Sequence, residues 1–235
     1  IYGNEDPMYI LAGLPFIAPD YSSAWLLKDV QMGYLQDKFA KKGLMILYTS
    51  PWPGQGFYTK TPVNSVADFK GKKLRIYSTA TQQMGSMLGF NATILPFAEI
   101  PQAFSTGLIE ALFTSPQTGI DIQAWDNTKH FTYAGAIFSK NAVVVSKKAF
   151  NALSKDDQMN ILAAAKKAEI RGWEMSAETT KKQIDILKKN GMSAKNAPDE
   201  VISKMKSIGL EMMKSWRSKA SPEANAVLDR YLSMR

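Results

Sequence analysis

The stretch "DFKGKKLRIYST", residues 68–79, poses the main question of this sequence. Gly71 is expected to end a short helix that starts at Ser65, and a strand is predicted over residues 72–77. Arg75 lies in the middle of that strand, between two apolar residues. Burying a guanidinium is unfavourable unless it is paired and hydrogen-bonded. A strand that carries Arg75 therefore implies an anion that meets it.

The segments that follow alternate between helix and strand. Apolar periodicity, glycines and prolines predict, in order, a helix over 80–89, a strand over 91–97, a short helix over 98–107 and a strand over 108–115. This order is typical of parallel βαβ units, and so of an α/β fold. The segment 51–60, with two prolines and two glycines, is predicted to be a loop or a crossing segment.

The outer parts of the chain add helices and two more strands. The same signals predict a helix over 22–40, a strand over 43–50, a strand within 141–150, and terminal helices over 199–218 and 222–233. The most regular segment lies between Ser154, a capping residue, and Gly191, a stop signal. At the helical rise this segment is roughly 50 Å long. A helix of that length exceeds one small lobe, so we expect it to run across two.

Composition excludes several kinds of chemistry. The chain has 235 residues, no cysteine and one histidine, His130. Disulfides, thiolate metal sites and a cysteine nucleophile are therefore excluded, as are metal sites that need two imidazoles. The net charge of +8 attracts anions, but no basic stripe with interleaved aromatics is present, which disfavours nucleic acid. We expect no metal and no cofactor.

A candidate binding site lies at the ends of the predicted strands. Five residues fall at or just beyond those ends, where ligands bind in open parallel sheets: Arg75, Ser78, Phe97, Thr114 and Ser115. A guanidinium there can hold a carboxylate in a bidentate fork. Aromatic residues in neighbouring segments could enclose an apolar ligand body: Trp52, Phe57, Phe113 and Trp125. From the residues alone a second interpretation stays open, in which Arg75 pairs with an internal acid and the aromatics are core.

The sequence over 62–115 resembles the solute-binding subunits of TRAP (tripartite ATP-independent periplasmic) transporters. The matching pieces, in chain order, are "LAGLPFIAPDYSSAW" (11–25), Pro62-Val63, "DFKGKKLR" (68–75), "LPFAEI" (95–100), "AFSTG" (103–107) and "NAVVVSKKAFNALSKDDQMNILAAAKKA" (141–168). The resemblance implies a two-lobed periplasmic-binding-protein-like α/β fold with a hinge and a long helix that spans both lobes.

The resemblance also implies a division into lobes and a cellular place. We expect lobe one to comprise residues 1–52 plus 141–180, and lobe two residues 53–140 plus 181–235. Family members carry further residues before the Pro-Phe segment, so lobe one is expected to lack its N-terminal part here. The implied location is the periplasm, with a signal peptide that is not present in this chain.

The family's motifs assign roles to individual residues. The Arg that ends its Lys-Ile-Arg motif binds the ligand carboxylate and corresponds to Arg75. A second arginine is common where this chain has Gln55, so a second acidic group on the ligand is disfavoured. Phe113 and Thr114 stand where Glu and Asn are usual, which removes the acid that some members use for a metal. The expected ligand-binding residues are Arg75, Thr114, Phe97, Gln55, Ser78, Trp52, Phe113 and Ser115.

These assignments lead to one functional hypothesis and two alternatives. We expect an extracytoplasmic receptor that captures an organic acid, such as a 2-oxo or aromatic monocarboxylate, for TRAP-type secondary transport. Its partners would be the ligand and the membrane subunits of the transporter, and it would be a monomer or a homodimer. The alternatives are a sensory or regulatory carboxylate-binding module and, less favoured, an enzyme on a similar scaffold. The lack of a nucleophile or base beside Arg75 argues against an enzyme.

Overall fold

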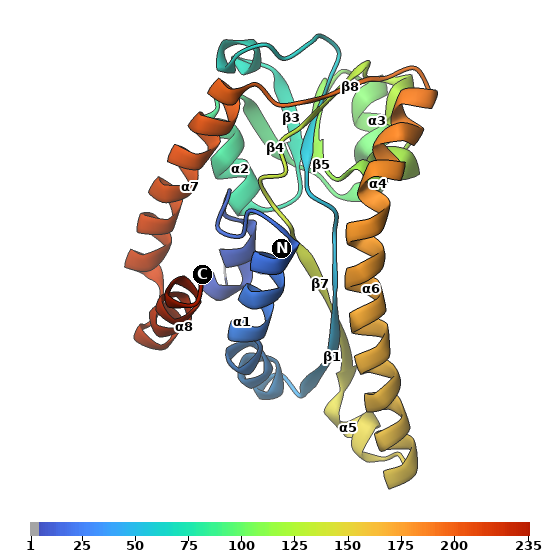
Figure 1. Cartoon of the computed structure of the whole chain (residues 1–235), viewed down its shortest axis with the longest axis vertical. Coiled ribbons are helices and arrows are strands. Elements are labelled where there is room, and N and C mark those ends of the chain that lie inside the picture. The colour runs from blue at the N-terminus through green and yellow to red at the C-terminus, as the bar shows by residue number, and fades with distance from the viewer. Residues whose placement is uncertain (1–4) are drawn as a thin grey trace.

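The computed structural model describes residues 5–235 and has two lobes, each built on one β-sheet (Figure 1). The strands are β1 (Leu44–Pro51), β2 (Gly56–Thr59), β3 (Lys73–Ile76), β4 (Asn91–Ile94), β5 (Ala111–Thr114), β6 (His130–Tyr133), β7 (Lys140–Ser146) and β8 (Ser193–Asn196). The α-helices are α1 (Tyr21–Lys41), α2 (Thr79–Met87), α3 (Ile100–Ser105), α4 (Pro116–Asp121), α5 (Lys147–Asn151), α6 (Lys155–Lys189), α7 (Asp199–Lys219) and α8 (Pro222–Ser233). Four short 3₁₀ helices complete the described chain: η1 (Pro7–Gly13), η2 (Val66–Phe69), η3 (Phe97–Glu99) and η4 (Ala124–Asp126).

The two sheets differ in size and in strand direction. One lobe holds the antiparallel pair β1 and β7. The other holds six strands in the order β4-β3-β5-β2-β6-β8, in which β3 is parallel to both β4 and β5. The predicted βαβ arrangement is therefore confirmed for these three strands, whose carboxyl ends lie at one edge of the sheet. Strand β2, the fourth in this order, runs antiparallel to both of its neighbours, β5 and β6.

The segment 51–60 was predicted as a loop or crossing segment, and that prediction is wrong for its second half. Residues 56–59 form β2, which is buried along its whole length between β5 and β6. Four residues that begin with a glycine and follow two prolines and another glycine give no periodic signal, and the strand is stabilised by its two neighbours instead of by local propensity. Residues 52–55 cross between the two sheets, so the predicted crossing segment is confirmed for this part of the range.

The long helix α6 spans both lobes, as expected. Its 35 residues begin after Ser154, whose side chain accepts a hydrogen bond from the amide of Asp157, and end before Gly191 at a positive φ of 86°. The helix contacts β1 in the smaller lobe and both α4 and β8 in the larger one. Figure 1 shows it running along the full height of the molecule.

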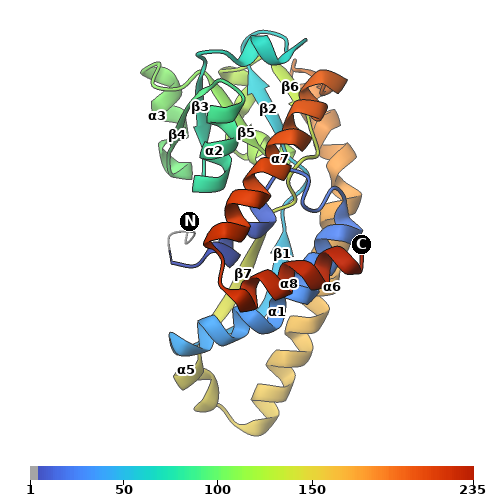
Figure 2. The same ribbon diagram turned by 90° about the vertical axis from the view of Figure 1, so that its left-hand side faces the viewer.

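The C-terminal helices also connect the lobes. Helix α7 contacts α2 and η2, and then runs towards the smaller lobe, where α8 packs against α1 (Figure 2). The division expected from the sequence assigned α1 and α8 to different lobes. The exact residue boundaries of the two lobes remain a prediction.

Two core clusters lie on opposite faces of the six-stranded sheet. Leu74 and Ile76 of β3 belong to the larger cluster, which continues into the smaller lobe. Leu112 of β5 belongs to the second cluster, which includes residues of α3 and α6. Because side chains alternate along a strand, Arg75 points to the face of the second cluster, where Leu112 is its partner in the ladder.

A tight contact between α7 and residues 15–16 generates a test of this packing. A Cβ on Gly209 would overlap the carbonyl group of Pro15, whereas a Cβ on Gly33, in the exposed middle of α1, would meet nothing within 4 Å. We expect Gly209→Ala to lower the free energy of unfolding by about 1–3 kcal/mol through overpacking. Gly33→Ala should raise it by up to about 1 kcal/mol, because alanine favours the helix. Urea unfolding of both variants measures this; equal effects would contradict the packing of α7.

A second test concerns the partly buried Lys140, the first residue of β7. Its ammonium donates to Gln31 Oε1 at 2.8 Å and lies near a second ammonium, that of Lys28, which is paired with Asp29 and Glu169. Burial and the charge of Lys28 lower the pKa of Lys140 from 10.5 to about 8. Between these values the folded state binds fewer protons than the unfolded state, so stability rises as the pH rises through this window.

We therefore expect the free energy of unfolding to rise from about pH 7.5 to about pH 10 more steeply in the unmodified chain than in Lys140→Met. Urea unfolding at both pH values gives the two slopes. Parallel slopes would show that the ammonium of Lys140 is not desolvated in the folded protein.

Candidate functional site

The candidate site is centred on Arg75, next to the carboxyl ends of β3, β4 and β5. Its side chain is 4% exposed, and its ladder neighbours are Thr93 in β4 and Leu112 in β5. The strand ends at Ile76, one residue further on, so the guanidinium lies close to the edge of the sheet. The fold therefore buries a positive charge near the edge where ligands bind in open parallel sheets.

Arg75 has no acidic partner among residues 5–235. Its Nε donates to the carbonyl oxygen of Leu95 at 3.0 Å, and its Cζ lies 6.0 Å from the ring centre of Tyr77. None of the ion pairs of the described chain includes it. Burial lowers the pKa of the guanidinium, and Tyr77 offsets part of this effect. The interpretation in which Arg75 pairs with an internal acid is thus unsupported, and an anion from outside the chain would satisfy the charge.

Gln55 is connected to this arginine through Tyr77, and both ends of its side-chain amide are hydrogen-bonded within the protein. The amide oxygen accepts from the hydroxyl of Tyr77 at 2.7 Å, and the amide nitrogen donates to Ser139 Oγ at 3.0 Å. Gln55 is 2% exposed. In this geometry Oε1 and one N–H of Nε2 bind other residues of the protein, so Gln55 positions Tyr77 and Ser139, and one N–H of the amide has no hydrogen-bond partner within residues 5–235.

The other polar residues expected at the site have local structural partners as well. Ser78 accepts from the amide of Thr81 and so caps α2, while Ser115 accepts from the amide of Thr118 and caps α4. Thr114, the last residue of β5, is 4% exposed. All three stand at the same edge of the sheet as Arg75, where the sequence placed them.

The aromatic residues expected at the site divide into two groups. Phe97 is 51% exposed at the start of η3, two residues after Leu95. Trp52 is partly buried in the crossing segment, where its indole donates to Asn141 Oδ1 at 3.2 Å. Phe113 instead has no exposed surface, and its ring lies 4.8 Å from that of Phe57 in the core. The structure therefore places Phe97 at the surface, two residues after the carbonyl group that binds Arg75, and places the ring of Phe113 in the core.

Two residues of this arrangement, Tyr77 beside Arg75 and Ser139 beside Gln55, were missed by sequence reasoning. Tyr77 follows Arg75 by two residues and so extends on the same side of the chain, a spacing that could have found it. Ser139 lies 64 positions along the chain, and only the pairing of the crossing segments brings it to Gln55: the amide of Trp52 donates to the carbonyl oxygen of Ser139 at 2.7 Å. No local pattern predicts such a contact.

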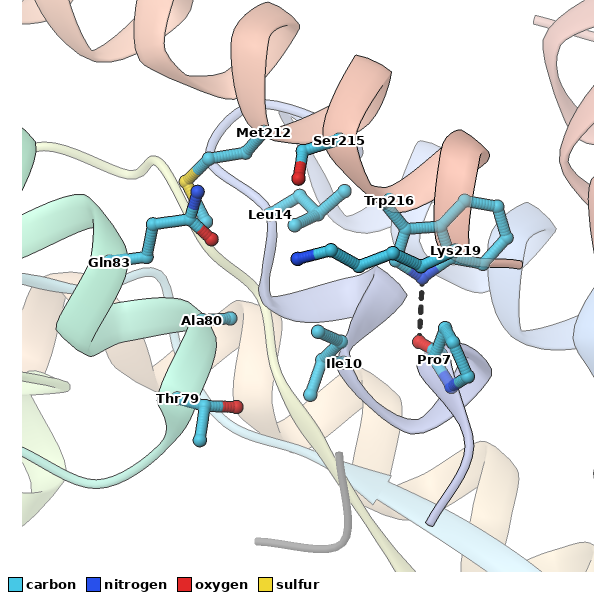
Figure 3. A pocket seen from close by; sticks show the side chains of 10 residues that line it. All are labelled: Pro7, Ile10, Leu14, Thr79, Ala80, Gln83, Met212, Ser215, Trp216 and Lys219. Carbon is cyan, nitrogen blue, oxygen red and sulfur yellow. Dashed lines mark hydrogen bonds between the residues drawn. The ribbon is translucent and has the colours of Figure 1, made fainter. Parts of the chain in front are cut away.

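A separate cavity of about 230 Å³ lies between η1, α2 and α7 (Figure 3). Trp216 Nε1 donates to the carbonyl oxygen of Pro7 at 2.6 Å in its wall, and the side chain of Lys219 extends across it. Its lining includes Thr79 of α2 but not Arg75, Gln55 or Tyr77. The cavity is therefore distinct from the surroundings of the buried arginine.

The described residues form neither a metal-binding cluster nor a membrane-spanning helix. Residues 5–235 contain no group of three or more His, Asp or Glu side chains arranged to hold a metal ion. No helix within the same range combines the length and the apolar character that crossing a bilayer requires.

Comparison with known proteins places this arrangement in a family. The profile of DctP, the bacterial extracellular solute-binding proteins of family 7, matches residues 2–219. The chain belongs to this family. Its relatives include the 2,3-diketo-L-gulonate-binding periplasmic protein YiaO of Escherichia coli, which is 26% identical over 81% of this chain and 59% of its own length. Another is the C4-dicarboxylate-binding periplasmic protein DctP of Rhodobacter capsulatus, which is 25% identical over 76% of this chain and 54% of its own.

Solved structures of family 7 proteins match the fold closely. DctP7 of Bordetella pertussis, an extracytoplasmic solute receptor binding pyroglutamic acid, is 39% identical with a TM-score of 0.95 and covers 98% of this chain. DctP6 of the same organism, which also binds pyroglutamic acid, is 36% identical with a TM-score of 0.95 and covers 99%. This chain spans 76% and 77% of those two proteins, and between half and two thirds of the curated relatives named above. The TRAP resemblance and the two-lobed fold expected from the sequence are confirmed.

The different placement of two phenylalanines can be tested by stability alone. Phe113→Ala should lower the free energy of unfolding by about 3–5 kcal/mol, because it removes a fully buried ring. Phe97→Ala should lower it by less than about 1 kcal/mol, because a half-exposed ring contributes little to folding. Urea unfolding of the two variants measures both values. A large effect of Phe97→Ala would show that its ring packs in the core and not at the surface.

Proposed function

We propose that this chain is the solute-binding receptor of a TRAP transporter and captures a small monocarboxylate. The observation that carries the proposal is Arg75, a nearly fully buried guanidinium without an acidic partner in the described chain. An unpaired buried charge is strongly unfavourable, and a bound carboxylate relieves it through two charge-assisted hydrogen bonds. Lobe closure over the ligand would exclude water and strengthen this ion pair.

The surroundings of Arg75 favour a ligand with one acidic group. Gln55 offers no second positive charge, and its amide is already bonded to Tyr77 and Ser139. The described residues near the strand ends add neutral hydroxyls, Ser78 and Thr114, and the exposed ring of Phe97, suited to pack on an apolar ligand body. A second carboxylate would be desolvated here without a cationic partner.

Pyroglutamate is the ligand we put forward first. It has one carboxylate and a small lactam ring, which fits one guanidinium and neutral surroundings. Support comes from DctP7 and DctP6, both named as binding pyroglutamic acid at 39% and 36% identity. Trp52 and Phe97 would enclose the ring, with Ser78, Thr114 and Ser115 near the polar edge. The core position of Phe113 leaves it outside this proposed pocket.

The proposed role is transport without catalysis. The ligand-loaded, closed form would dock on the membrane subunits of the transporter outside the cytoplasm, in the periplasm. No bond of the ligand is made or broken in this cycle. The family and its solved members are solute-binding proteins, which agrees with this role.

A thermal-shift titration with pyroglutamate tests the proposal. A ligand that binds the native state alone raises its stability by RT ln(1 + [L]/Kd), so the melting temperature should rise with concentration. Arg75→Ala should weaken binding by about 100-fold, since hydrogen bonds to charged groups contribute about 1.5–3 kcal/mol each. Arg75→Lys should restore little, because an ammonium cannot form the bidentate fork.

Matched controls isolate the carboxylate and the arginine. The lactam 2-pyrrolidinone keeps the ring but lacks the acid, so it should give no shift. Arg171→Ala removes an exposed arginine of α6 and should leave the affinity unchanged. A panel of 2-oxo, aromatic and dicarboxylic acids covers the other ligand classes. If no carboxylate shifts the melting temperature, or if Arg75→Ala binds as tightly as the unmodified chain, the proposal fails.

A further inference from the structure

We infer that Tyr77 is a positioning residue that links the hinge between the lobes to the ligand-binding guanidinium of Arg75. The inference rests on the proposed function for the role of Arg75, but the link itself consists of contacts within the chain. It runs from Ser139 in one crossing segment, through Gln55 in the other, to Tyr77 at the end of β3, and from there to Arg75.

Each step of this chain is a direct contact. Ser139 Oγ accepts from Gln55 Nε2 at 3.0 Å, and Gln55 Oε1 accepts from the hydroxyl of Tyr77 at 2.7 Å. The ring of Tyr77 then lies 6.0 Å from the guanidinium carbon, within the range of a cation–π contact. The residues are also held in place by burial, since Gln55 is 2% and Arg75 4% exposed.

Gln55 is the point at which both crossing segments meet. Its carbonyl oxygen accepts from the amides of Ala134 and Gly135, at 3.2 and 2.9 Å, on the chain that leaves β6 for β7. Its side chain holds Ser139 at the far end of the same segment. A rotation of the lobes changes the backbone angles of these two segments, and Gln55 must move with them or give up a buried hydrogen bond.

Arg75 has few other anchors that could hold its orientation. Within residues 5–235 its side chain makes one hydrogen bond, from Nε to Leu95, which fixes one edge of the guanidinium. The face of the planar group is set by the ring of Tyr77. A shift of Tyr77 therefore turns the two terminal nitrogens that would grip a carboxylate, so hinge position and carboxylate affinity are coupled.

The hydroxyl of Tyr77 stays a donor at every physiological pH. Burial raises its pKa to about 12, with the hydrogen-bonding contacts to Gln55 and Ser139 opposing this rise. The donor is therefore permanent, and removal of the oxygen by Tyr77→Phe leaves Gln55 Oε1 buried without a partner. Leaving a buried acceptor unsatisfied weakens the arrangement by more than the loss of one exposed hydrogen bond.

The experiment is a double-mutant cycle on the affinity for pyroglutamate, measured by calorimetry. Tyr77→Phe should weaken binding by about tenfold and Ser139→Ala by about threefold, the range expected for single hydrogen bonds. The double variant should bind no more weakly than Tyr77→Phe alone, because once the link is cut at Tyr77 the loss of Ser139 has no path to Arg75. Additive effects, or an unchanged affinity in Tyr77→Phe, would overturn the inference.

A control comes from β7, the strand that follows Ser139. Ser146→Ala removes a hydroxyl at the other end of β7, where it accepts from the amide of Ala149 and caps α5. It should leave the affinity unchanged and combine additively with Tyr77→Phe. If Ser139 only stabilised the fold, Ser139→Ala would combine additively with Tyr77→Phe, as Ser146→Ala is expected to do.

A second readout needs no ligand and keeps this inference apart from the proposed function. The chain has no cysteine, so Ser105→Cys in α3 and Ala152→Cys after α5 accept a fluorophore pair, one on each lobe. Tyr77→Phe and Ser139→Ala should each shift the interlobe energy transfer, and the double variant should shift it no further than the larger of the two. If the chain binds no carboxylate but shows this pattern, the hinge link stands and the ligand proposal falls. Unchanged energy transfer in both variants would overturn the link.

Discussion

The constraint on which the structure depends is a guanidinium that the protein buries without an acidic partner in the described part of the chain, residues 5–235. Every local feature around Arg75 serves this arrangement: β3 carries it to the sheet edge, the carbonyl group of Leu95 takes one of its donors, and Tyr77 covers one face. Folding supplies enough hydrogen bonding to tolerate the charge but not enough to neutralise it. A bound carboxylate would compensate the remaining charge of the guanidinium. The unfavourable free energy of the empty site and the affinity proposed for a ligand therefore have the same origin.

The same constraint explains why the site has to be made of two lobes. A charge at an open sheet edge would be hydrated, and its attraction for a carboxylate would be small. A second lobe that can close over the edge excludes water, provided that the connection between the lobes is both ordered and movable. The two crossing segments connect the lobes in an ordered way, because Gln55 ties them to each other and to Tyr77, the residue after β3, through hydrogen bonds that must shift when the lobes rotate.

Much of the fold and of the site could be predicted from the sequence. The parts that could not be predicted have one physical reason in common. The long helix, the parallel strands and the position of Arg75 all follow from local signals: periodicity, a capping serine and glycine stops. Strand β2 was missed because four buried residues owe their conformation to neighbours far along the chain. Phe113 and Arg75 show the limit for sites: both lie on short buried strands, yet the ring faces the core and the guanidinium faces the other side of the sheet. The sequence does not give the register of a strand in its sheet, so it does not show which face of the sheet each of these side chains occupies.

The continuous helix α6 has a mechanical consequence. Its middle is held against β1 of the smaller lobe, where Thr49 contacts Glu169 and Trp173, and its C-terminal part is held by α4 and β8 of the larger, with no proline in its 35 residues to act as a joint. A rotation of one lobe against the other must therefore flex this rod, since breaking either set of contacts would expose buried surface. Flexing is elastic, and the rod returns to its resting curvature when the load is removed. If the lobes close over a ligand as proposed, the bending of α6 would favour their reopening.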